Sequence, residues 1–146
     1  MSSFTTPLRF EEIDVQKWKI LENFIFYRGS INDNDVYLVP RGFITDGASV
    51  PRQLWSIMPP VGAKYSKAAV IHDMLYATEM VTRAEADKIF LEAMKVLKVS
   101  KWKRWSMYLA VRAAGWRVWQ KHDRAEVLRL RTWVESETIK YQQEML

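Results

Sequence analysis

Helical periodicity begins near Tyr65 and continues almost to the end of the chain. Within it, "YSKAAVIHDMLYATEM" is apolar nearly all round and predicts a largely buried helix. "TRAEADKIFLEAMKVLKV" predicts a second helix, and Thr82 with Glu85 three residues later indicates a capping box at its start. Two further helices are expected at about 101–121 and 124–144. Short connections between consecutive helices favour a bundle of antiparallel neighbours.

The segment before these helices carries strand and turn signals instead. "NFIFYRG" and "DVYLVP" are rich in β-branched and aromatic residues, and the turn-rich "SINDN" between them predicts a hairpin or two adjacent strands. "RGFITDGASVP", with two glycines and a proline, predicts a loop that enters a short helix "RQLWSIM". We therefore expect one α+β domain, predominantly α, over residues 1–146, with an N-terminal antiparallel β element and loop at about 17–64 and helices at about 65–144.

Composition narrows the class of protein. A chain of 146 residues that is 49% hydrophobic and 27% charged is globular rather than disordered. It has no cysteine, so no disulfides hold it together, which fits a reducing compartment. The N-terminus lacks the pattern of a signal peptide, and no run of about 18 apolar residues predicts a transmembrane segment.

The apolar stretch "AAVIHDMLY" contains two ionisable side chains, His72 and Asp73. Buried charges are costly unless partners compensate them. Tyr76 follows His72 by four residues and therefore lies on the same face of the helix, whereas Asp73 is rotated by about 100°. On the next helix, Asp87 lies at the edge of the apolar stripe. Because the two helices should be antiparallel neighbours, we expect Asp87 to reach His72 across their seam.

These residue types fit general-base chemistry. A histidine can take a proton from water when a carboxylate holds its other ring nitrogen in the correct tautomer, and Asp87 would hold His72 in this way. Asp73 would then bind a hard cation that polarises a substrate carbonyl and stabilises the oxyanion. The alternative is a buried hydrogen-bond network that specifies helix packing without catalysis. Both interpretations stay open at this point.

Several other chemistries are excluded. Two histidines and no cysteine are too few for a zinc site, and no further histidine precedes the pair at residue 72, as HD-type phosphohydrolases require. Neither a glycine-rich phosphate loop nor a G-x-S-x-G nucleophile motif occurs. The second HD pair, His122 and Asp123, has Glu126 at the +4 position in the polar "KHDRAE" and predicts a solvated turn between helices.

In order and spacing, "GFITDGASVPRQLW", "AAVIHDMLY" and "RAEADKIFLEAM" resemble a bacterial and phage family known as domain of unknown function 1353, across roughly residues 36–116. That family implies no activity. Its occurrence in phage genomes implies a virus-encoded protein of the host cytoplasm or the virion. A non-catalytic phage protein that contacts other phage proteins, either as a tail-associated component or as a binder of a host factor, is therefore an alternative to an enzyme.

A helix with H-D-x-x-Y, followed by an antiparallel helix with an Asp, is similar to the active site of secreted phospholipases A2. This resemblance implies a hydrolase that acts on an ester such as a phospholipid. It implies that His72 is the general base, that Asp87 orients it, and that Tyr76 donates a hydrogen bond to Asp87.

The segment "TDGAS" at 45–49 resembles the T-D-G-x-S segment of some bacterial and fungal phospholipases A2. The resemblance implies that Asp73 binds calcium together with this loop, so that Asp46 and Gly47 become candidate metal-binding residues. For Asp46 the alternative is a turn carboxylate that bonds its own backbone, as is common in Asp-Gly turns.

The net charge of +5 is unevenly placed, because residues 101–146 hold 10 basic and 5 acidic side chains and five of the seven tryptophans. The helix expected at about 101–121 holds six cations and no acid. It is either a core helix with cations along its margins or a surface for an anionic phospholipid membrane. A nucleic-acid surface is a third possibility without a recognisable motif. The candidate surface residues are Lys101, Trp102, Arg104, Trp105 and Arg112.

Overall fold

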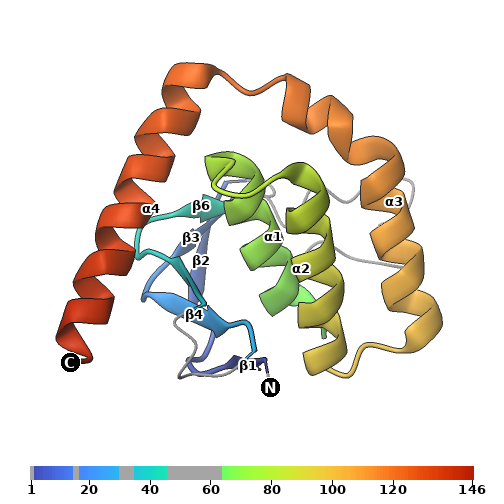
Figure 1. Ribbon diagram of the computed structural model, residues 1–146, viewed down its shortest axis with the longest axis horizontal. Coiled ribbons are helices and arrows are strands. Elements are labelled where there is room, and N and C mark those ends of the chain that lie inside the picture. The colour runs from blue at the N-terminus through green and yellow to red at the C-terminus, as the bar shows by residue number, and fades with distance from the viewer. Residues whose placement is uncertain (1, 15–16, 30–34, 46–63) are drawn as a thin grey trace.

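The computed structural model describes residues 2–14, 17–29, 35–45 and 64–146 (Figure 1). In these ranges, small antiparallel sheets at the N-terminus precede a run of four helices, which confirms the predicted α+β class. The helices are α1 (Ser66–Thr78), α2 (Arg83–Val96), α3 (Lys101–Gln120) and α4 (Arg124–Glu144).

Two three-stranded antiparallel sheets, in the orders β1-β4-β5 and β2-β3-β6, form the β part of the described chain. The predicted pair of adjacent strands is confirmed, since Phe24 lies opposite Val39 and Tyr27 lies opposite Val36. The strands are β1 (Ser3–Phe4), β2 (Phe10–Asp14), β3 (Lys17–Ile20), β4 (Phe24–Tyr27), β5 (Val36–Val39) and β6 (Ile44–Thr45).

The predicted start of the β element near residue 17 was wrong, because β1 and β2 precede it. Every residue of β2 is exposed, so this edge strand lacks the alternation of apolar and polar side chains that marks a half-buried strand. β1 is only two residues long and is too short to show a pattern. The short helix expected in "RQLWSIM" lies outside the described residues.

Helix α1 is the centre of the core. It contacts α2, α4, β5 and β6, and this explains why its sequence is apolar on nearly every side. Figure 1 shows α3 beside α2, away from the sheets, and α4 along the strands. α2 begins at the predicted N-cap, because the Thr82 hydroxyl accepts a hydrogen bond from the backbone N–H of Glu85 at 3.2 Å, and the Glu85 carboxylate pairs with Arg28.

No helix in the described ranges combines the length and the apolar character that crossing a membrane requires.

Candidate functional site

The seam between α1 and α2 brings His72 and Asp87 together, as the antiparallel arrangement predicts. Nε2 of His72 lies 2.8 Å from Oδ1 of Asp87, and both side chains are buried, with exposed fractions of 2% and 0%. The imidazole ring also packs against Tyr76 and Phe90, with ring centroids 4.3 and 4.6 Å away. Three neighbours therefore fix the orientation of the ring.

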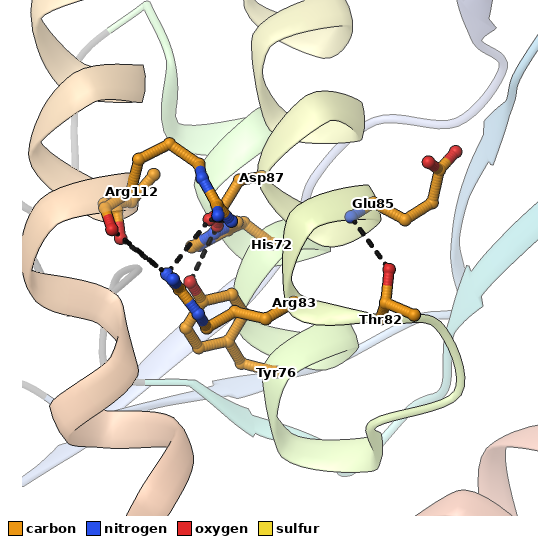
Figure 2. A network of polar contacts seen from close by, with 8 residues as sticks. His72, Tyr76, Thr82, Arg83, Glu85, Asp87 and Arg112 are labelled. Atoms are coloured by element: carbon orange, nitrogen blue, oxygen red, sulfur yellow. Dashed lines mark hydrogen bonds and ion pairs between the residues drawn. The ribbon is translucent and has the colours of Figure 1, made fainter.

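Asp87 is the hub of a larger polar network (Figure 2). The Tyr76 hydroxyl donates to the same carboxylate oxygen as His72, at 2.7 Å. Nη1 of Arg112, from α3, lies 2.9 Å from the other oxygen, and Nη1 of Arg83 lies 3.4 Å from it. Arg83 also donates to the backbone carbonyl of Val111 at 3.1 Å. The network thus joins α1, α2 and α3 around one buried carboxylate.

The surroundings of Asp87 favour its ionised form. Burial raises the pKa of Asp87, but hydrogen bonds from His72 and Tyr76 and the Arg112 guanidinium outweigh it, so that the pKa lies below its ordinary value of 3.8. An ionised carboxylate can only accept hydrogen bonds. Nε2 of His72 must therefore carry the proton that faces Asp87, which leaves the lone pair of neutral His72 on Nδ1.

A cavity of about 30 Å³ lies against His72 between α1 and α3. About 10–15 Å³ of such space is enough to hold one water molecule. The cavity therefore has room for a water but not for a substrate molecule. Its lining residues are His72, Tyr76, Ala110, Val111, Ala114, Gly115 and Val118.

Asp73 faces a different opening from His72. It borders a groove of about 570 Å³ between α1, α4 and β6. Thr45 of β6 and the exposed ion pair of Glu126 and Arg129 also line this groove. Within the described ranges, no cluster of three or more His, Cys, Asp or Glu side chains could hold a metal ion. The other predicted metal residues, Asp46 and Gly47, lie outside the described residues.

The predicted surface residues all lie on α3, but they divide into two groups. Trp102 and Trp105 are exposed, and so is Lys101. Arg112 is instead tied to Asp87, and Arg104 donates to the Val99 carbonyl at 3.0 Å. The alternative of a core helix was wrong for Trp102, Trp105 and Trp116, which are exposed, whereas Trp119 packs against the core.

Two features of the site were missed from the sequence, and one prediction outside the site needs correction. Arg83 and Asp87 have the i, i+4 spacing of a helical ion pair, and this spacing could have predicted their contact from the sequence. The approach of α3 to Tyr76 depends on Gly115, a glycine in a helix interior, where it is otherwise unfavourable. The prediction of a solvated turn at His122 needs correction, since Nδ1 of its half-buried ring lies 3.1 Å from Oε1 of Glu79.

Gly115→Ala is expected to destabilise the protein by about 1–3 kcal/mol, although alanine alone would favour a helix by about 1 kcal/mol. A Cβ at this position would overlap the Tyr76 hydroxyl and lie 3.2 Å from Nη1 of Arg83. Urea unfolding measures the change in the free energy of unfolding. In a Tyr76→Phe background the same substitution should cost less, because the clashing oxygen is gone. A neutral or stabilising Gly115→Ala would show that α3 does not pack this closely.

Two comparisons place the chain among known proteins. The family model described as "Protein of unknown function (DUF1353)" matches residues 18–111. A protein of Sinorhizobium fredii (strain NBRC 101917 / NGR234), "Uncharacterized protein y4jT", is 40% identical over 78 residues, which are 53% of this chain and 23% of that protein. The chain thus covers less than a quarter of this relative's length. No solved structure matches the chain. The family match includes α1 and α2, and with them His72 and Asp87.

Proposed function

The chain belongs to the DUF1353 family, and from this premise we propose that it is a hydrolase in which His72 is the general base for attack of water on an ester. The observation that carries the proposal is the contact of 2.8 Å between Nε2 of His72 and the ionised Asp87. Asp87 holds the histidine in the tautomer that leaves Nδ1 able to accept a proton. Tyr76 supports this role by donating to the same carboxylate oxygen.

The proposed reaction begins with a water molecule at Nδ1 of His72. Nδ1 takes one proton of the water, and the water oxygen bonds to the carbonyl carbon of the ester. The tetrahedral intermediate then expels the alcohol, which receives the proton from His72, so that the products are an acid and an alcohol. Because the cavity of about 30 Å³ has no room for an ester, α3 moves away from His72 to admit the substrate.

Asp73 is the proposed site for calcium, together with the segment of Asp46 and Gly47. The proposal rests on the groove at Asp73, which Thr45 also lines, since carboxylate, hydroxyl and carbonyl oxygens are the ligands that calcium prefers. A calcium ion held there would supply positive charge within this groove, which lies on a different side of α1 from the cavity at His72. The phospholipid class of ester follows from the likeness of the H-D-x-x-Y helix to phospholipases A2.

Asp73→Asn is expected to lower calcium-dependent ester turnover by about 10²-fold or more, because it removes the anionic ligand. The assay compares a panel of phospholipids and short-chain esters in calcium and in a chelator. The matched control is Glu126→Gln, which removes a carboxylate from the same groove but whose side chain pairs with Arg129. Equal calcium dependence in wild type and Asp73→Asn would contradict the metal role and leave the role of His72 to be tested separately.

A second candidate is a non-catalytic phage protein, such as a tail-associated component or a binder of a host factor. The observation in its favour is the burial of His72 to 2% exposure beneath α3, with two arginines on Asp87. In that case the network only fixes helix packing. Copurification with virions or with one host protein, without turnover of any ester by the wild type, would select this candidate.

A further inference from the structure

Helix α3 exposes a stripe of large apolar side chains to solvent. Trp102 is 64% exposed and Leu109 is 60% exposed, and Trp105 and Trp116 are exposed as well. At about 100° per residue, the four positions fall within about 60° of arc around the helix axis. We call these four residues the outer face of α3. The side chains that α3 buries point the opposite way, so the outer face takes no part in holding the fold together.

Positive charges follow both margins of the outer face. Lys101 and Arg112 lie along one margin and Arg117 lies near the other, whereas Lys103 and Lys121 lie further round the helix toward its buried side. The helix contains no acidic residue. Arg112 pairs with Asp87, but within the described residues no acidic side chain pairs with the other four cations. The guanidinium of Arg117 lies over the Trp116 ring at 5.5 Å and so extends along the apolar stripe.

We propose that the outer face of α3 docks on the surface of a membrane that contains anionic phospholipids. Indole rings favour the headgroup level of a bilayer, and the cations at the margins are placed to meet lipid phosphates while Leu109 reaches the acyl boundary. The apolar centre of the face has no counterpart on a phosphate backbone, which makes nucleic acid a poorer fit. A dimer formed through two copies of the outer face is also a poorer fit, because it would bring the cations of the two helices together.

Docking on a membrane does not depend on the proposed hydrolysis, because it uses the side of α3 that faces away from His72. The same helix covers the cavity at His72 with its inner side, through Val111 and Gly115. A membrane that holds α3 by its outer face would therefore act on the element that must move to admit a substrate. Binding and turnover are measured separately, so either can fail without the other.

The test is cosedimentation of the full chain with vesicles at physiological salt. One set contains phosphatidylglycerol and phosphatidylcholine in equal parts, and the other contains phosphatidylcholine alone. We expect binding to the anionic vesicles. Trp102→Ser with Leu109→Ser should weaken it by about tenfold or more, since both apolar contacts with the bilayer are lost. Lys101→Gln with Arg117→Gln should weaken it by about fivefold for each charge removed.

Matched controls carry the same changes elsewhere. Leu128→Ser with Ile139→Ser alters two α4 side chains of similar exposure, 54% and 55%, and Lys88→Gln with Lys95→Gln removes two exposed charges of α2. Both should bind like wild type, and circular dichroism should show that all variants are folded. Absence of binding, equal binding to neutral vesicles, or equal losses in the controls would overturn the proposal. The proposal would also be overturned if the chain bound duplex DNA or RNA, or dimerised, without binding vesicles, and if the outer-face variants abolished that association.

Discussion

Asp87→Ala should lower the free energy of unfolding by about 3–5 kcal/mol, the range measured when one partner of a buried ion pair is removed. The carboxylate is fully buried and receives hydrogen bonds from His72 and Tyr76, whose polar atoms would lose their acceptor. Arg112 would also keep its charge beside an apolar cavity, although its 33% exposure lets water compensate in part. Urea unfolding followed by circular dichroism measures this loss.

The control for Asp87→Ala is Glu135→Ala, an exposed acidic residue of α4, which should change the stability by less than about 0.5 kcal/mol. Acid adds an independent check. Because the folded-state pKa of Asp87 lies below 3.8, its stabilisation is present above the unfolded-state pKa and is lost as the pH falls through the folded value. Asp87→Asn should remove this part of the acid dependence. A loss below about 1 kcal/mol for Asp87→Ala would show that the network does not hold the helices.

Much of the helical part was predictable because its signals are local. The Thr82 hydroxyl caps α2 as the motif indicates, the apolar periodicity sets the buried face of α2, and the nearly continuous apolar sequence of α1 indicates that it is buried. Once the two helices are antiparallel, the position of Asp87 at the edge of its stripe is enough to bring it to His72. The short connection between α1 and α2 and the position of Asp87 on α2 were therefore enough to predict the contact with His72.

What could not be predicted depends on which elements meet across the chain. The outer face of α3 has the spacing of a core stripe, and only the packing of α3 through Gly115 shows that the stripe faces solvent. The pairing of Arg112 with Asp87 joins residues 25 positions apart on different helices, so no local pattern reveals it. Strand β2 is exposed throughout and pairs with β3 through backbone hydrogen bonds, for which its side chains give no signal.

His72→Asn is expected to lower ester turnover by about 10²–10⁴-fold, the usual contribution of a positioned general base. Asparagine has no group that can take a proton from water at neutral pH, and its shorter amide does not reach the place of Nε2, so Asp87 keeps only the hydrogen bonds from Tyr76 and the arginines. The protein should therefore remain folded, with some loss of stability because the ring contacts to Tyr76 and Phe90 are removed. Near-UV circular dichroism and the melting temperature monitor the fold beside the activity.

The most direct measurement is kcat/KM of the purified wild type and of His72→Asn, on the ester of the panel that the wild type hydrolyses best and with calcium present. If His72 is the general base, the wild type turns over the ester, and the folded variant loses at least about 10²-fold in kcat/KM. If the wild type hydrolyses no ester, or if the folded variant keeps its activity, His72 is not a catalytic base and the network around Asp87 serves only to hold α1, α2 and α3 together.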